Sequence, residues 1–335
     1  MPKKFSFLSK LLILALFFSF IGCTPKVDSN DEKSTDKLNI TFIGATTTGT
    51  LFMIINAIGE CVERSYPGSV VTIISGSVGV NPTRISNNEA DASLTHNVTA
   101  FAAIQGKPPF GEKTENIASI ASLYPSVLQI AVTKQAGIYT MDEFINNKMP
   151  LKFSLGQRGS NTDILFNEII AEYGITIDDI QAWGGEIVYQ GISNTAQMLA
   201  DGSIDGGVFS ILVPIPQLLE ASRGDDFTIL KINQQVLQIL TEQYNYEHTI
   251  IPAESYPFMK EDIPTICSYT IVIVPADSSD EAAYKIAASI TEHIEYLHTV
   301  HVSLENITTE SLVTNLGIPL HPGAEKYYRE QGIIK

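Results

Sequence analysis

Residues 40–50, ITFIGATTTGT, and residues 151–162, LKFSLGQRGSNT, repeat one pattern in the two halves of the chain. Each begins with an apolar run typical of a β-strand, and each run ends in a glycine, Gly44 or Gly156. A polar loop follows, and a threonine six residues after the glycine stands where a helical pattern begins. This order of elements predicts the strand, turn and helix of a parallel sheet with crossover connections.

A second pair of matching segments follows in the same order. Residues 88–94, NEADASL, and residues 202–208, GSIDGGV, each end a helical pattern, pass through an aspartate and open a strand. Chance can supply one such match, but two in the same order and at nearly the same offset indicate two equivalent halves. The sequence therefore predicts two α/β lobes.

The expected lobes are discontinuous in sequence. We assign residues 38–128 plus 278–335 to lobe 1 and residues 129–277 to lobe 2. The polypeptide passes from one expected lobe to the other near Gln129–Val132 and near Ile271–Val274. Both segments are apolar and rich in β-branched residues, as hinge strands would be. Two connecting strands would allow the lobes to close as rigid bodies.

The amino-terminal segment has the features of a targeting signal and is not expected to be part of the fold. A basic start precedes an apolar run over residues 11–21, which is short for a bilayer span, and Cys23 follows a glycine. We interpret residues 1–22 as a lipoprotein signal peptide, Cys23 as the acylated (palmitate-bearing) residue and residues 23–37 as a flexible tether. The alternative is an uncleaved anchor helix. Both place the protein outside the cytoplasm, anchored to a bacterial membrane in the periplasm or at the cell surface.

Net charge limits the partners. The chain carries a formal charge of −16, and leaving out the three lysines of the signal takes it to −19. This argues against nucleic acid and against an anionic membrane surface as partners. An anionic ligand would therefore need strong local donors, because the overall field repels it.

No segment supplies a convincing catalytic set. Dinucleotide, P-loop and His-Glu-x-x-His motifs are absent from the sequence. His293, His298 and His301 fall within one expected helix, but only the last two share a face, which is too few for a metal site. We therefore expect a monomeric binding protein, not an enzyme, with no cofactor and no metal.

The candidate ligand site lies where the two repeated loops face each other. In open parallel sheets ligands bind beyond the carboxyl ends of the strands, and helix amino termini there attract anions. The candidates in lobe 1 are Thr46, Thr48, Thr50, Ser77 and Asn97, and those in lobe 2 are Arg158, Ser160, Asn161, Thr162 and Ser210, with Tyr124 as a wall near the crossing. Three alternatives stay open: the hydroxyl residues as plain helix caps, Arg158 as a solvated charge, and Tyr124 as hinge packing.

The chain also resembles a known family, the TAXI solute receptors of TRAP transporters. The most specific stretch is residues 319–332, PLHPGAEKYYREQG, which looks like the terminal signature of that family. Supporting stretches, in order, are ISGSV at 74–78, ASLYP at 121–125, ESYP at 254–257 and IVIVPAD at 271–277. The resemblance covers residues 38–332.

The resemblance implies a two-lobed α/β periplasmic-binding-protein fold of the second type (type II), with a central cleft and hinge strands. It also implies delivery of a small carboxylate, such as a glutamate-like or 2-oxoglutarate-like acid, to a TRAP-type membrane permease driven by an ion gradient. The chain departs from the family pattern in its loops, where Gln157 and Arg158 replace two prolines and residues 95–97 read THN. The ligand therefore stays open.

Two other functions remain possible on the same fold. One is the substrate-binding lipoprotein of an ABC importer, driven by ATP. The other is an extracytoplasmic enzyme or adhesin, because a fold does not fix a function.

Overall fold

The computed structural model describes residues 37–47, 49–222 and 226–335. The predicted signal peptide, Cys23, nearly all of the tether and Thr48 lie outside these residues. Within the described ranges, no helix combines the length and the apolar character that a membrane span requires.

Lobe 1 is an α/β layer built around the first repeat. Strand β1 lies between β2 and β3 and runs parallel to both. The lobe consists of β1 (Asn39–Ile43), α1 (Thr50–Ser65), β2 (Val70–Ile74), α2 (Asn81–Ser86), β3 (Ala92–His96), α3 (Asn97–Gln105), α10 (Asp280–Glu292), α11 (Ile294–Val300), the short 3-10 helices η2 (Val302–Leu304) and η3 (Ser311–Val313), and α12 (Pro322–Glu330).

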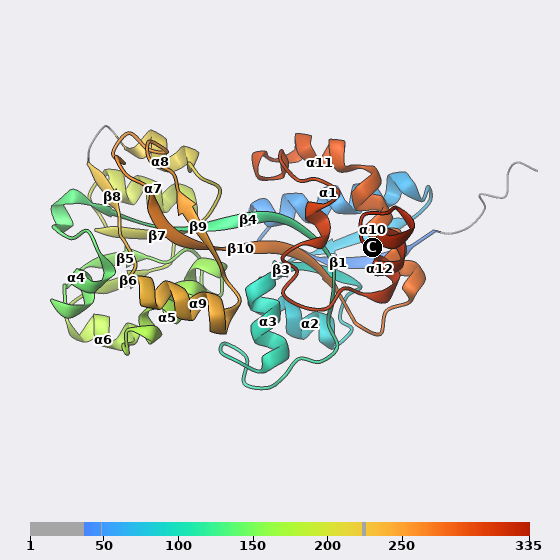
Figure 1. Ribbon diagram of the computed structural model, residues 1–335, viewed down its shortest axis with the longest axis horizontal. Coiled ribbons are helices and arrows are strands. Elements are labelled where there is room, and N and C mark those ends of the chain that lie inside the picture. Colours follow the sequence, from blue (N-terminus) through green and yellow to red (C-terminus); the bar gives the residue numbers. More distant parts are fainter. Residues whose placement is uncertain (1–36, 48, 223–225) are drawn as a thin grey trace, which may run out of the picture. The chain divides into compact units, whose positions relative to one another are not determined.

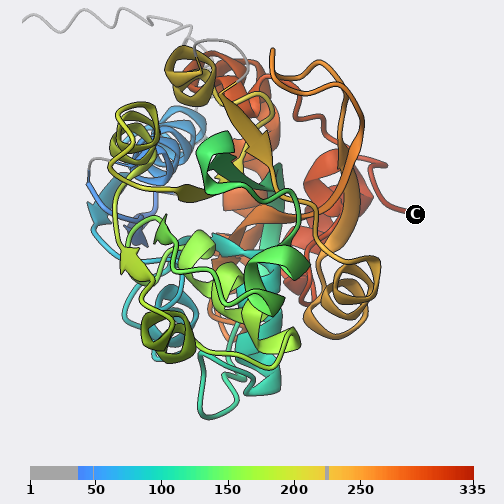
Figure 2. The ribbon, with the colours of Figure 1, turned by 90° about the vertical axis from the view of Figure 1, so that its left-hand side faces the viewer.

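Lobe 2 repeats this arrangement around the second copy of the pattern. Strand β5 lies between β6 and β7 and runs parallel to both. The lobe consists of η1 (Lys134–Ala136), α4 (Met141–Asn146), β5 (Lys152–Ser154), α5 (Asn161–Glu172), α6 (Ile177–Ala182), β6 (Glu186–Val188), α7 (Ile192–Ala200), β7 (Gly206–Ile211), α8 (Pro216–Ala221), β8 (Phe227–Ile229), α9 (Gln234–Tyr244) and β9 (Glu247–Ile251). In Figure 2, where lobe 2 faces the viewer, its helices lie on both sides of its strands.

Two long strands connect the lobes. Figure 1 shows β4 (Ala118–Thr133) and β10 (Ile263–Val274) running side by side from one lobe to the other, and they pair antiparallel. They join the described strands into one sheet of order β2-β1-β3-β10-β4-β7-β5-β6, with β8 on β4 and β9 on β10. The two-lobed α/β fold is confirmed. The parallel pairing predicted for the repeated units is confirmed. The two connecting strands, for which the sequence predicted no direction, each pair antiparallel with their neighbours.

The internal repeat extends to individual hydrogen bonds. In lobe 1 the carboxylate of Asp91 accepts the backbone N–H of Thr41 at 2.7 Å, and in lobe 2 that of Asp205 accepts the N–H of Lys152 at 2.8 Å. The backbone N–H groups of both aspartates donate back to Thr41 and Lys152. Each aspartate thus fixes the start of the strand that leads to a cleft loop.

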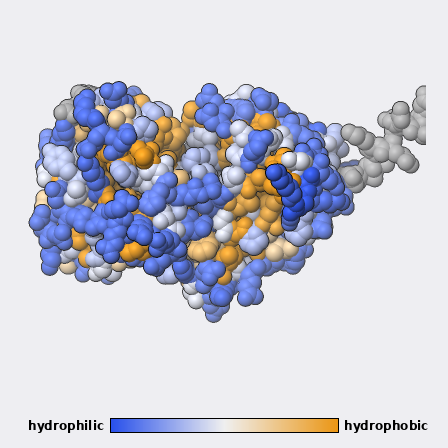
Figure 3. Space-filling view, in the orientation of Figure 1, coloured by the Kyte–Doolittle hydropathy of each residue, from blue (hydrophilic) through white to orange (hydrophobic). Residues whose placement is uncertain are grey.

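The lobes have separate hydrophobic cores. Helix α1 buries Ile54, Ile55, Ile58 and Val62 in lobe 1. Lobe 2 is centred on aromatic rings such as Phe153, whose ring centroid lies 5.1 Å and 5.8 Å from those of two other phenylalanines. The surface in Figure 3 is largely hydrophilic, with smaller apolar areas between.

The lobe boundaries suggested by the sequence stay a prediction. The sequence analysis put the second connection between the lobes near Ile271–Val274. These residues pair with β3 and with the first part of β4, whereas Ile263–Cys267 pair with β9 in lobe 2. We therefore place the crossing within β10 between Cys267 and Ile271, a few residues before the boundary at 277.

Candidate functional site

A cavity of about 870 Å³ lies between the lobes, at the carboxyl ends of the parallel strands. Its walls come from the loops after β1, β2, β5 and β6, and from β4 and β7. This volume lies within the range of small-molecule sites. The predicted residues that line it are Thr46, Thr50, Ser77, Tyr124, Arg158, Ser160, Asn161, Thr162 and Ser210. Whether they bind a ligand stays a prediction.

Two predicted residues are not among those lining the cavity. Thr48 lies outside the described residues. Asn97 is buried in the first turn of α3, and its side-chain oxygen accepts the backbone N–H of Tyr269 on β10 at 2.8 Å. Its role in the structure is therefore to hold α3 against β10, and its neighbour His96 lines the cavity in its place.

In lobe 1, helix α1 begins at the cavity wall. Its N-cap is Gly49, which has no side chain to cap the helix, and Gly49 donates its own N–H to the carbonyl of Thr46 at 2.8 Å. The backbone N–H groups of Thr50 and Leu51 have no hydrogen-bond partner among the described residues. These are unsatisfied donors at the positive end of a helix, so they favour an anion.

In lobe 2, helix α5 begins on the opposite wall. Ser160 caps it by accepting the N–H of Asp163, and Thr162 donates its hydroxyl to the carbonyl of Leu155 at 2.7 Å. The capping interpretation therefore holds for the side chain of Ser160, while the N–H groups of Asn161 and Thr162 stay unpaired within the described chain. Gly156 is required before this turn, because a Cβ there would stand 2.2 Å from the Thr162 hydroxyl and its φ is +77°.

A third helix start, which the sequence analysis missed, completes the wall. Strand β6 leads through Tyr189, Gln190 and Gly191 into α7, and these residues line the cavity together with the first turn of the helix. The N-cap Gly191 has no side chain, as in α1. The signal was present in the sequence, since residues 186–195, EIVYQGISNT, repeat the pattern of strand, glycine and hydroxyl-rich helix start.

The floor of the cavity carries two neutral ring side chains. His96 at the end of β3 and Tyr124 on β4 are both about 95% buried and both line the cavity. Burial lowers the pKa of His96 to about 4 and raises the pKa of Tyr124 to about 12. Both side chains are therefore uncharged at neutral pH and act as hydrogen-bonding groups.

Among the described residues that line the cavity, Arg158 alone carries a formal charge. Its guanidinium carbon lies 4.1 Å from the ring centroid of Tyr189, and it has no ion-pair partner in the described part of the chain. The whole sequence contains 37 aspartates and glutamates against 21 lysines and arginines, yet none of the described residues that line the cleft is a carboxylate. The formal charge of the described residues that line the cleft is thus opposite in sign to the net charge of the whole protein.

The lobes touch at the mouth of the cleft. The hydroxyl of Ser77, in the loop after β2, donates to the carbonyl of Gly159, in the loop after β5, at 3.0 Å. Gly79 faces the same carbonyl, because a Cβ there would stand 3.0 Å from the Gly159 oxygen. We call Ser77, Gly79 and Gly159 the closing seam.

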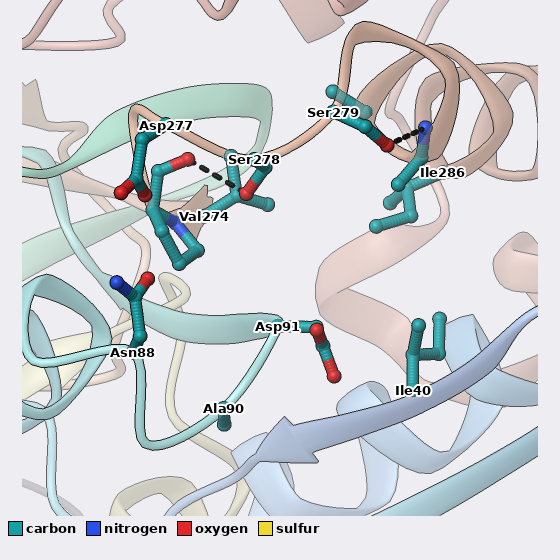
Figure 4. Close-up of a pocket in the computed structure, with 12 residues that line it drawn as sticks. Ile40, Asn88, Ala90, Asp91, Val274, Asp277, Ser278, Ser279 and Ile286 are labelled. Carbon is teal, nitrogen blue, oxygen red and sulfur yellow. Dashed lines mark hydrogen bonds between the residues drawn. The ribbon is translucent and has the colours of Figure 1, made fainter.

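A smaller hollow of about 300 Å³ lies at the amino ends of β1 and β3, away from the cleft (Figure 4). Its polar groups are bonded within the protein: Asp91 holds Thr41, Ser278 donates to the carbonyl of Pro275, and Ser279 caps α10. With two aspartates and no cation in its lining, it does not suit an anion.

The histidines that the sequence grouped near residue 300 do not gather as ligands. His298 bonds the carbonyl of Ile307 at 2.8 Å, and His301 accepts the N–H of Ser303 at 3.1 Å. Among the residues described by the structure, no three His, Cys, Asp or Glu side chains are grouped as a metal site requires.

The fold is shared with known binding proteins. The periplasmic binding protein BugD aligns with a TM-score of 0.53 and 11% identity, over 89% of this chain and 99% of that chain. The protein XAC2383 from Xanthomonas citri, in a structure bound to ATP, aligns with a TM-score of 0.51 and 10% identity, over 89% of this chain and 97% of that chain. These likenesses confirm the periplasmic-binding-protein fold. The sequence profile of the NMT1-like family matches residues 42–332.

Proposed function

The chain belongs to the NMT1-like family, and from this premise we propose that it is an extracytoplasmic receptor for a small carboxylate solute. The observation that carries the proposal is the reversal of charge in the cleft. In the part of this acidic protein that the structure describes, the interlobe cavity is lined by one arginine, three helix amino termini and no carboxylate. Unpaired N–H groups at helix starts and a guanidinium are the donors that carboxylates prefer.

The proposal assigns a role to each wall. The N–H groups of α1 in lobe 1 and of α5 and α7 in lobe 2 approach the cavity from opposite sides, so a carboxylate bound between them would hold the lobes together. Arg158 at the mouth would contribute a long-range attraction and a direct contact. A ligand that contacts both lobes stabilises the closed form through its greater affinity for that form.

We further propose that the receptor serves a TRAP-type permease, as the TAXI resemblance over residues 319–332 implies. The alternative is delivery to an ATP-driven importer. Uptake of the bound acid into vesicles that contain the cognate permease distinguishes them. Uptake that stops on collapsing the ion gradient supports the first, and uptake that requires ATP supports the second.

We propose that acyl chains on Cys23 anchor the protein to the membrane. Labelled palmitate incorporated into the wild type but not into Cys23→Ala, with release of the variant from the membrane fraction, is the expected result. Labelling of both would refute acylation at Cys23. A variant that remains in the membrane would favour the uncleaved anchor helix.

We propose binding without catalysis, which is supported by the description of BugD as a binding protein. The test of the whole proposal is a thermal-shift panel of small carboxylates, amino acids and neutral sugars. A ligand at one hundred times its dissociation constant stabilises a fold by about 2.7 kcal/mol. A shift with an acid supports the proposal. A shift with a neutral sugar alone, or conversion of the bound compound, would contradict it.

A further inference from the structure

A chain of hydrogen bonds runs beneath the cavity and contacts both lobes. His96 Nδ1 lies 3.3 Å from the hydroxyl of Ser268 on β10, and the same hydroxyl lies 3.3 Å from Asn161 Nδ2. Asn161 Nδ2 also donates to the hydroxyl of Ser210 at 2.8 Å, and Ser210 donates to the carbonyl of Ser126 at 3.3 Å. Of these, His96, Ser268 and Asn161 are each more than nine-tenths buried.

The donor-to-acceptor direction of this series of hydrogen bonds follows from its last acceptor, the carbonyl of Ser126. A backbone carbonyl only accepts, so the proton of Ser210 goes to Ser126 and the oxygen of Ser210 accepts from Asn161. The amide nitrogen of Asn161 therefore faces the two serines, and Ser268 accepts from it as well, while Asn161 Oδ1 is buried without a hydrogen-bond partner in the described part of the protein. The proton of Ser268 is then free to go to His96 Nδ1.

This direction favours one tautomer of His96, in which Nδ1 accepts the proton of Ser268. Since Nδ1 accepts, the neutral ring carries its proton on Nε2. No acceptor in the described part of the chain bonds Nε2, although the ring lines the cavity. The ring thus offers an uncharged N–H donor at the floor of the cleft.

We infer that His96 determines specificity, by donating a hydrogen bond from Nε2–H to an oxygen atom of the bound acid. The inference rests on the proposed function. It adds to the site a donor of a different kind, because helix ends and Arg158 attract negative charge in general, whereas a buried N–H selects for an oxygen at one position. A site built to hydrogen-bond a polar atom rejects analogues that lack it, because the buried donor is then left unpaired.

The surroundings of His96 keep this N–H donor uncharged between about pH 5.5 and 8. The titratable groups that line the cavity with it are Tyr124, Tyr189 and Arg158, and none of them is a carboxylate that would stabilise an imidazolium. On β10, Ser268 and Thr270 face it, and neither titrates. A binding role for the ring therefore predicts an affinity without a histidine inflection between about pH 5.5 and 8.

The first test needs no ligand. Long-range ¹H–¹⁵N spectra of the ¹⁵N-labelled full-length protein resolve the ring nitrogens of its 6 histidines, and His96→Gln assigns the signal. The expected signal is a neutral ring protonated on Nε2 alone from pH 5.5 to 8. Ser268→Ala, which removes the donor to Nδ1, should move the ring toward a mixture of tautomers. A ring protonated on Nδ1, or charged at pH 6, would overturn the inference.

The second test uses succinate, glutarate, 2-oxoglutarate and L-glutamate as probes in calorimetric titrations. For the acid that wild type binds, His96→Leu should weaken binding about 10-fold or more. His96→Gln, whose amide nitrogen stands close to the Nε2 position, should stay within about threefold. The matched control, exposed His248→Leu in lobe 2, should leave affinity unchanged.

The outcomes separate this inference from the proposed function. If wild type binds an acid and His96→Leu, folded by its thermal midpoint, binds it equally well, the inference fails while the proposed function stands. If His96→Gln is as weak as His96→Leu, the ring serves packing alone and the inference also fails. If wild type binds none of these four acids and no other carboxylate or amino acid of the thermal-shift panel, the proposed function itself is refuted, and the solute contact inferred for His96 falls with it.

Discussion

Gly79→Val should prevent full closure of the cleft without weakening either lobe. A Cβ at Gly79 would stand 3.0 Å from the carbonyl oxygen of Gly159 and 3.1 Å from Cδ1 of Ile164, both in lobe 2. The first neighbour is backbone and cannot rotate away, and valine adds two methyl groups beyond the Cβ. Gly79 is not in the left-handed region, so the substitution does not strain its own backbone.

The magnitude follows from where the clash occurs. Overpacking a close contact typically costs about 1 to 3 kcal/mol. Here the cost falls on the closed form alone, because the contact joins the two lobes. If the ligand binds the closed form, its affinity should fall by the same free energy, which is about 5- to 150-fold. The free energy of unfolding of the unliganded protein should change little.

Calorimetric titration with the acid that stabilises wild type most, combined with small-angle scattering, measures both effects. Gly111→Val is the matched control, because a Cβ at Gly111 has nothing within 4 Å. We expect a larger radius of gyration and weaker binding for Gly79→Val alone. Equal affinities for the two variants would refute the view that the closing seam must form when the ligand binds.

Three further predictions address charge, the internal repeat and pH. Arg158→Gln should weaken binding of acids about 3- to 5-fold at low salt and less at high salt, because the guanidinium is exposed at the mouth; titrations at two ionic strengths check this. Asp205→Ala should destabilise the fold by about 1 to 3 kcal/mol in urea unfolding, because it leaves the N–H of Lys152 without its acceptor; an unchanged midpoint would count against the strand-fixing role. Burial raises the pKa of Glu168 to about 7, although the hydrogen bond from Tyr246 opposes the shift. The native state therefore holds this proton longer than the unfolded state, so stability should fall as pH rises from about 4.5 to 7. Glu168→Gln should remove that part of the pH dependence, and an identical pH profile for both proteins would contradict the assignment.

Much of the fold was predictable because its signals are local. The repeated pattern ending at Gly44 and Gly156 encodes two strand-to-helix turns, and Gly156 is there because the hydroxyl of Thr162 occupies the space of a side chain. Asp91 and Asp205 recur at matching positions because each fixes the strand that begins its lobe. Such features depend on residues close in sequence or on a single repeated contact.

The antiparallel course of β4 and β10 was not predictable in this way. Apolar, β-branched runs show that a strand is buried, but its direction depends on which distant strands flank it. In this protein β10 comes from the far end of the chain and lies between β3 and β4. The periodicity of residues 263–274 contains no information on that placement.

In the site, too, the sequence does not predict which of two adjacent residues faces the cavity. His96 and Asn97 are adjacent, yet the first lines the cavity and the second turns away to hold β10. Which of the two faces the cleft depends on the junction of β3 with α3 and on Ser268, 172 residues away from His96 in sequence. The loop at Tyr189 differs in this respect, because its signal is local: residues 186–195 follow the same pattern of strand, glycine and hydroxyl-rich helix start.

The most direct test of the central claim compares succinate with its neutral diamide, succinamide, in calorimetric titrations of the full-length protein. The two probes have the same length and differ in charge. If the reversal of charge in the cleft governs recognition, succinate should bind at one site per chain, more weakly in Arg158→Gln, and succinamide should not bind measurably. Equal binding of both, or binding of succinamide alone, would contradict the claim that the cleft selects an anion.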